Sequence, residues 1–297
     1  MRSKRNSFYG LLSVAIPTVV VLAAYPILLR HLGADIVGVY LLATGLSGAW
    51  LFFDFGVSAA TLKFVAEDIA ADNQRAAAEV VMTSVVFYGV IGAVGALAIW
   101  FLAPALSHIF SIEAAMRHDA EWAFRLAGVR FAAFFLTTVF ASLFKGLQRF
   151  EYSLVILSTL QIVTFGGAIL GVLVADAGLI GISLIGMAAN LIILVLSVVL
   201  AVRLCRSNDV YLSRARPSLS TFRRIFSYGA FMGLNGIATT LTQMLQRALV
   251  SAVLGPGAVA VFSVAEMVAQ RANQVFAAIF EFIVPTVSAM AGDLNDE

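Results

Sequence analysis

Eight long runs of mostly apolar residues constrain this chain more than any other feature. A transmembrane helix needs about 20 such residues, and every run is long enough. They lie near 8–29, 36–59, 80–103, 121–143, 152–174, 177–202, 224–252 and 257–284. We therefore predict an all-α integral membrane protein, a polytopic helical bundle with one transmembrane helix for each run.

The composition excludes several classes of protein. Of the 297 residues, 61% are hydrophobic and 12% are charged, about half the charge of a soluble chain. Polar groups are too few to cover a globule in water, which excludes a soluble enzyme, a disordered chain and a nucleic-acid binder. One Cys and three scattered His residues predict neither a disulfide framework nor a metal site. No nucleotide-binding or hydrolase motif is present, so we expect no cofactor.

The positions of Lys and Arg predict the orientation, because cytoplasmic loops are enriched in both. With the N-terminus inside, the outer side carries Arg30 and Arg117, and four arginines fall within runs. The cytoplasmic side carries most of the 19 basic residues: Arg2, Lys4, Arg5, Lys63, Arg75, Lys145, Arg149, Arg203, Arg206, Arg214, Arg216, Arg223 and Arg224. We expect a multi-pass protein of a bacterial cytoplasmic (inner) membrane, with both ends of the chain cytoplasmic.

Two connectors are longer than turns. Residues 60–79 predict an amphipathic helix, which either lies along the cytoplasmic leaflet or extends the second run into solvent. Residues 203–223 are basic and contain Pro217. We interpret them as a cytoplasmic linker between a six-helix lobe, 1–202, and the first two helices of a second lobe, 224–297.

An internal repeat supports this division. Residues 32–43 return 222 positions later as residues 254–265, with Leu, Gly, Val, Val and Ala coinciding and Tyr40 matching Phe262. Both copies stand between the first and second runs of a unit. A unit is then six helices, and an even number of spans makes the repeat parallel.

Short motifs along the chain resemble a known family. They are Leu-Arg-His-Leu-Gly at 29–33, Gly-Val-Tyr at 38–40, Phe-Asp-Phe-Gly-Val at 53–57, Lys-Phe-Val-Ala-Glu at 63–67, Gly-Leu-Gln-Arg-Phe-Glu at 146–151 and Leu-Gly-Pro-Gly at 254–257. The chain resembles the polysaccharide transporters, the Wzx-type flippases of the multidrug/oligosaccharidyl-lipid/polysaccharide flippase superfamily. The resemblance implies two six-helix lobes and a lipid-linked glycan as substrate. We expect this chain, with one lobe and two further helices, to insert but not to translocate by itself.

Charged groups inside the runs are the candidate functional residues, because embedding one costs about 3 kcal/mol. Arg125 follows Glu121 by four residues, which predicts a structural pair. Arg247 lies near the outer end of its run, where either snorkelling or substrate contact would explain it. Arg130 and Arg271 lie deeper, and either a water-filled lumen or a buried ion pair, with Glu266 as partner of Arg271, would explain them.

Polar residues at four-residue spacing predict where such a lumen lies. Such spacing places Asn235, Thr239, Gln243 and Arg247 on one stripe, and Glu266, Gln270 and Gln274 on another. Hydrogen bonding between helices is the alternative. The candidate substrate-binding residues are Arg130, Arg247, Arg271, Arg30, Gln243 and Gln270. Glu266 and Asp54 are candidates for ion coupling, although a cap or structural pair is the simpler explanation for Asp54.

The hypothesis that follows is a non-enzymatic flippase. It would move an undecaprenyl-diphosphate-linked oligosaccharide, such as an O-antigen or exopolysaccharide repeat unit, from the cytoplasmic to the outer leaflet by alternating access. Its partners would be membrane lipid and the polymerase and glycosyltransferases of polysaccharide assembly. The alternatives are a cation-coupled multidrug exporter and a membrane glycosyltransferase or polymerase. The exporter would favour embedded carboxylates over arginines, and the enzymes would need larger polar loops.

Overall fold

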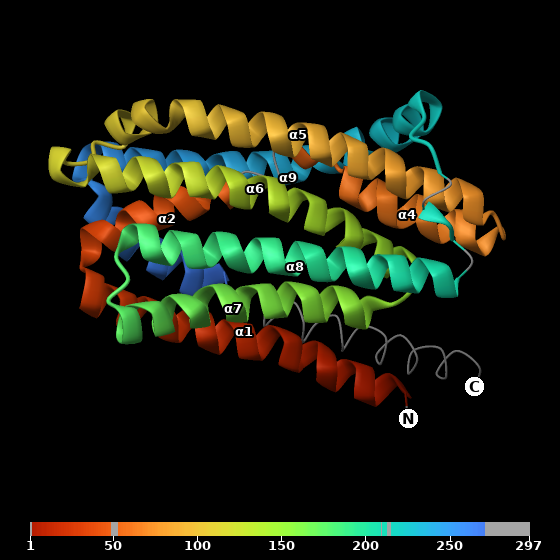
Figure 1. Cartoon of the computed structure of the whole chain (residues 1–297), viewed down its shortest axis with the longest axis horizontal. Coiled ribbons are helices and arrows are strands. Elements are labelled where there is room, and N and C mark those ends of the chain that lie inside the picture. Colours follow the sequence, from red (N-terminus) through yellow and green to blue (C-terminus); the bar gives the residue numbers. More distant parts are fainter. Residues whose placement is uncertain (1, 49–52, 209, 213–214, 271–297) are drawn as a thin grey trace, which may run out of the picture.

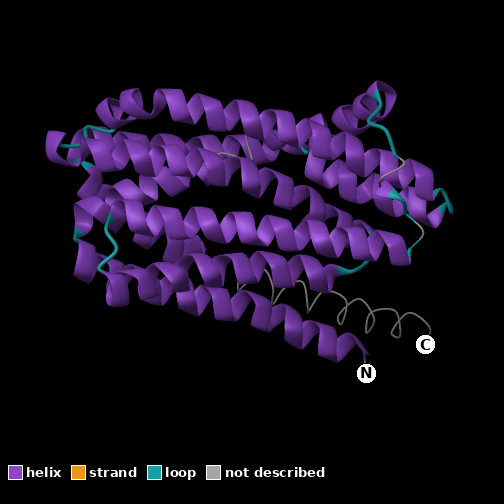
Figure 2. Cartoon of the chain, in the orientation of Figure 1, coloured by secondary structure: helices purple, strands orange, loops and turns teal. Residues whose placement is uncertain are grey.

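The computed structural model describes residues 2–48, 53–208, 210–212 and 215–270, with the backbone alone at 2–15, 47–48 and 231–240. The regular elements of this part of the chain are helices that run side by side along the long axis, joined by short loops (Figures 1 and 2). They are α1 (Arg2–Leu32), α2 (Ala34–Gly48), α4 (Val57–Ala70), α5 (Gln74–Ile109), the 3-10 turn Ala114–Met116, α6 (Arg117–Gly146), α7 (Phe150–Ala175), α8 (Leu179–Ser207), α9 (Leu219–Leu254) and the helix Pro256–Gln270.

Four helices in the described part of the chain are long and apolar enough to cross a membrane. They are α5, Ala114–Gly146, α7 and α8, and the segments Ile16–Leu32, Ala34–Leu46 and Pro256–Gln270 are shorter apolar helices. The helix Ala114–Gly146 is mostly covered by protein, whereas α5 exposes most of its apolar surface. The all-α membrane fold is thus confirmed, with α6 at the centre of the bundle.

The second apolar run differs from the prediction of one continuous helix over 36–59. Phe55 and Gly56 have φ angles of 46° and 69°, a left-handed turn that separates the run from α4. A helix cannot continue through two such residues. The α4 helix packs against α5, α6 and α9, so protein covers its apolar face. It is therefore neither a continuous extension of the second run nor a helix whose apolar face rests on lipid.

The predicted linker 203–223 is also shorter in the structure. Helix α8 continues to Ser207, because Leu204 and Cys205 are buried in the core. Arg206 lies in the last turn, where a cation interacts favourably with the helix dipole. Helix α9 begins at Leu219, so the connector between the helices is 208–218.

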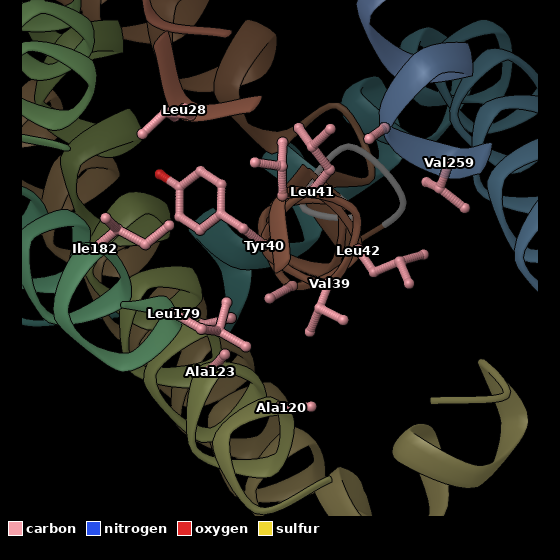
Figure 3. Packing of buried hydrophobic residues seen from close by; sticks show 14 of the residues in the cluster. Leu28, Val39, Tyr40, Leu41, Leu42, Ala120, Ala123, Leu179, Ile182 and Val259 are labelled. Atoms are coloured by element: carbon pink, nitrogen blue, oxygen red, sulfur yellow. The ribbon is translucent and has the colours of Figure 1, made fainter. Parts of the chain in front are cut away.

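The core divides into two clusters along the bundle. One contains Tyr25, Tyr40 and Phe124, near the turns α1–α2 and α7–α8. Figure 3 shows the Tyr40 ring projecting from α2 towards Ile182 of α8, with Leu28 of α1 close by. The other cluster contains Tyr88 and Phe135 and joins α4, α5, α6, α7 and α8 at the opposite end. Bulky aromatic side chains therefore fill both ends of the first lobe.

The predicted repeat has the same local geometry in both copies. Gly33 and Gly255 have φ angles of 83° and 82°, which favour glycine. The N–H of Gly33 donates to Leu29 O at 3.1 Å, and the N–H of Gly255 donates to Ser251 O at 2.9 Å. A new helix follows each turn, and these two helices touch where Gly38 meets the carbonyl of Pro256. Each copy is therefore a glycine-capped helical turn, and the two copies lie side by side.

Candidate functional site

The pair predicted at Arg125 is present. Arg125 Nη2 lies 3.2 Å from Glu121 Oε2 on the same helix. The guanidinium also lies 5.1 Å from the ring centre of Trp122 and 5.9 Å from that of Trp100. Carboxylate and aromatic faces both stabilise the cation, so Arg125 has a structural role.

Arg247 of α9 forms an ion pair with a residue of another helix, so the spacing of charges along α9 could not predict it. Its Nη2 and Nε lie 3.0 and 3.2 Å from Glu266 Oε2 on the next helix, and Gln270 Nε2 donates to Glu266 Oε1 at 3.2 Å. Both charged side chains are largely buried, at 24% and 14% exposed. Glu266, considered from the sequence as a partner of Arg271, is thus paired with Arg247. Arg271 lies outside the described residues.

A glycine of α2 makes room for this pair. A methyl group on Gly45 would lie 3.2 Å from Nη1 of Arg247. The guanidinium therefore sits between α2, α9 and the helix Pro256–Gln270. Gln243, one turn earlier on α9, is half-buried. Two of the predicted binding residues, Arg247 and Gln270, thus meet at one carboxylate.

Arg130 lies on α6, thirteen residues from its start and about 20 Å along it. Its guanidinium packs against the backbone of α8 at Gly186, where a methyl group would lie 2.9 Å from Nη1 and 3.0 Å from Cζ. Nε of Arg130 is buried without a hydrogen-bond partner. No acidic side chain in the described part of the chain forms a salt bridge with it. Within the described residues, Arg130 is thus a cation without an acidic partner, deep in the bundle and packed against a glycine.

Asp54 and Arg30 occupy different surroundings. Asp54 is buried between α2 and α4 and accepts hydrogen bonds from Ser58 Oγ at 2.9 Å, from Ser58 N at 3.3 Å and from the hydroxyl of Tyr88. These contacts tie the start of α4 to α5. Arg30 is exposed in the last turn of α1. Ion coupling by Asp54 and substrate contact by Arg30 stay predictions.

Sequence reasoning missed one polar cluster entirely. Arg224 of α9 contacts Asp68 of α4, 156 residues earlier, with Nη–Oδ distances of 3.2 and 3.3 Å. The signal in the sequence was the pair of adjacent carboxylates, Glu67 and Asp68, because two neighbouring acidic residues in so apolar a chain indicate a cationic partner. Among the described residues, no three His, Cys, Asp or Glu side chains lie close enough to hold a metal ion.

Known proteins are similar to this chain in sequence or in architecture. A "Putative O-antigen transporter" of Shigella flexneri is 25% identical over 287 residues, which cover 96% of this chain and 66% of that protein. A multidrug resistance MATE family transporter of the MOP superfamily, solved in an inward-facing conformation, has a TM-score of 0.67 at 15% identity, covering 86% of this chain and 60% of its own. A MOP superfamily transporter from Pyrococcus furiosus has a TM-score of 0.54 at 13% identity, covering 91% and 68%.

The solved structures are similar in fold alone, whereas the family assignment rests on sequence. The chain spans just under two thirds of the Shigella flexneri relative. The family described as "Polysaccharide biosynthesis protein" matches residues 3–291, nearly the whole length. The chain therefore belongs to the polysaccharide biosynthesis protein family.

Proposed function

We propose that this chain is part of a flippase that moves a lipid-linked oligosaccharide, carried on undecaprenyl diphosphate, from the cytoplasmic to the outer leaflet. The family membership supports a role in polysaccharide export. The observation that supports the substrate class is Arg130, a cation deep inside an apolar bundle that no acidic side chain of the described residues compensates. An embedded charge is expensive unless water or an opposite charge reaches it. A diphosphate headgroup supplies that charge, whereas an organic cation would be repelled.

The geometry favours Arg130 over the other arginines as the anion contact. Arg125 and Arg247 already have carboxylate partners, and their charges are compensated within the protein. Arg130 would bind the diphosphate in a hydrated path, while the two lobes, 1–202 and 224–297, expose that path to each side in turn. Because Gly186 has no side chain, the guanidinium can lie against the backbone of α8. In a bacterial inner membrane with both ends cytoplasmic, glycosyltransferases and a polymerase would supply and use the substrate.

Glycan export by a chimera tests this proposal. The chimera replaces the matched segment of the Shigella flexneri relative with this chain, in a strain that lacks its own O-antigen transporter. We expect export to be restored, to fall at least tenfold with Arg130→Ala or Arg130→Gln, and to survive Arg125→Ala. The expected loss corresponds to about 1.4 kcal/mol, the low end for a charge-assisted hydrogen bond. Membrane abundance is measured in parallel. Export that is unaffected by Arg130→Ala would remove Arg130 from the mechanism.

Gly186 offers a second arm of the same experiment. Gly186→Val forces the Arg130 guanidinium to move, because branched carbon atoms would occupy its place. Gly166→Val is the matched control, since nothing lies within 4 Å of a methyl group on Gly166 of α7. We expect export to fall in the first variant and not in the second at equal abundance. Equal export by both variants would show that the packing of Arg130 against Gly186 is unimportant.

A further inference from the structure

Two tryptophans and an ion pair form a cluster where α5 and α6 run side by side (Figure 1). The rings of Trp100 and Trp122 pack edge to face, with 6.1 Å between their centres. The guanidinium of Arg125 lies over both rings, and its Nη2 lies 3.2 Å from Glu121 Oε2. Both rings are exposed, and the side chains of Arg125 and Glu121 are 20% and 25% exposed. A molecule outside the bundle can therefore reach all four side chains, which we call the tryptophan cluster.

An apolar stripe of α5 leads away from the tryptophan cluster. Four side chains at spacings of three and four residues share this helix face, and each is more than half exposed. They are Val90, Val94, Leu97 and Phe101. From Val90 to Trp100 the helix rises about 15 Å, which is half of a hydrocarbon core about 30 Å thick. The stripe therefore has the length of the acyl chains of one leaflet.

Polar residues lie on the other side of the tryptophan cluster. The turn between α5 and α6 and the first turn of α6 carry Glu113, Arg117 and Asp119. Trp122 follows Arg117, the first residue of α6, by five residues, or about 8 Å along the helix. Tryptophan is enriched at the interface between membrane and water. The cluster thus stands at the level of the lipid headgroups, at the end of a face that contacts the acyl chains.

From this position we propose that the tryptophan cluster binds the headgroup of a phospholipid that carries both a phosphate and a primary ammonium, as phosphatidylethanolamine does. Arg125 donates to the phosphate oxygens, and Glu121 accepts from the N–H groups of the ammonium. The acyl chains lie along the stripe on α5. This inference goes beyond the proposed flippase function and does not depend on it.

The charges of the cluster favour this headgroup over the other common ones. The ion pair has no net charge, so Arg125 attracts the phosphate of an anionic lipid while Glu121 repels it. A quaternary ammonium has no N–H group to donate to Glu121. Aromatic faces can hold a quaternary ammonium instead, but the guanidinium of Arg125 already lies over both rings. A headgroup with both charges and with N–H donors therefore fits best.

Fluorescence quenching by brominated phospholipids tests the proposal. The chain has three tryptophans, so a Trp50→Phe background leaves the two of the cluster. The full chain is reconstituted in phosphatidylcholine vesicles with a rising fraction of brominated lipid, whose headgroup is ethanolamine, choline or glycerol. The quenching curves give relative binding constants at the two rings. We expect the ethanolamine lipid to bind about threefold more strongly than the others, the effect of a partly exposed ion pair. Equal binding of all three lipids would overturn the proposal.

Glu121→Gln gives a signature that a purely structural ion pair would lack. It leaves the charge of Arg125 uncompensated, so the preference should change from the ethanolamine lipid to the anionic glycerol lipid. Glu113→Gln is the matched control, because it removes the same charge from an exposed position in the nearby turn, and it should leave the order of the three lipids as it is. An unchanged order in Glu121→Gln, with helical circular dichroism intact, would overturn the proposal. If this variant misfolds, the comparison of the three lipids still decides, because it changes no residue of the cluster.

Discussion

Arg247→Ala should destabilise the protein, because it leaves the carboxylate of Glu266 without its cationic partner. In the structure Glu266 accepts two hydrogen bonds from Arg247 and one from Gln270. When Arg247 is removed, the carboxylate of Glu266, whose side chain is only 14% exposed, keeps a single hydrogen bond, from the side-chain amide of Gln270. Exposed pairs contribute about 0–1 kcal/mol, and breaking a fully buried pair costs about 3–5 kcal/mol. The partial burial of both groups places the expected loss at about 2 kcal/mol, or about thirtyfold in the unfolding equilibrium.

A double variant measures how much of this loss comes from the unpaired charge of Glu266. Arg247→Ala/Glu266→Gln removes both charges and keeps the hydrogen-bonding shape at residue 266. We expect it to recover at least half of the loss, because the remaining glutamine no longer carries an uncompensated charge. Gln246→Ala, at an exposed position on α9, is the control and should change little.

The free energy of unfolding is measured by titrating mixed micelles with sodium dodecyl sulfate and following helical circular dichroism. If Arg247→Ala and the double variant are equally unstable, the pair does not compensate an embedded charge and the reasoning is wrong. If Arg247→Ala is as stable as the wild type, Arg247 reaches the headgroups or the substrate instead, the two alternatives that its position in the sequence favoured. Export by the chimera should fall with Arg247→Ala only in proportion to membrane abundance.

Two further predictions concern orientation and helix contact. An impermeant thiol reagent applied to intact cells should label Ala114→Cys and not Arg203→Cys, both exposed, in a Cys205→Ser background, because cytoplasmic loops are enriched in Lys and Arg; the opposite pattern would reverse the predicted topology. Gly38→Ala should destabilise the chain by about 2 kcal/mol in the same titration, because the added methyl overlaps the Pro256 carbonyl. Gly166→Ala, which meets open space, should stabilise slightly through helix propensity, and equal effects of the two substitutions would contradict the close contact.

The sequence by itself determined the features that depend on neighbours along one helix. Apolar runs of about 20 residues have few ways to satisfy their backbone in lipid except as helices, and the all-α membrane bundle follows. The Glu121–Arg125 pair follows from four-residue spacing, which brings two side chains together on any helix. The turns at Gly33 and Gly255 follow from the repeat, because glycine readily adopts their positive φ.

Only the tertiary structure decided which helix faces meet. Arg247 and Glu266 lie on two helices joined by a turn, and Arg224 and Asp68 are 156 residues apart. The contact of Arg130 with Gly186 depends on which face of α6 is turned towards α8. The turn at Phe55–Gly56 interrupts a run whose hydropathy alone predicts a continuous helix. Periodicity specifies which residues share a face, but the partner of that face depends on helix packing, which is a property of the whole chain.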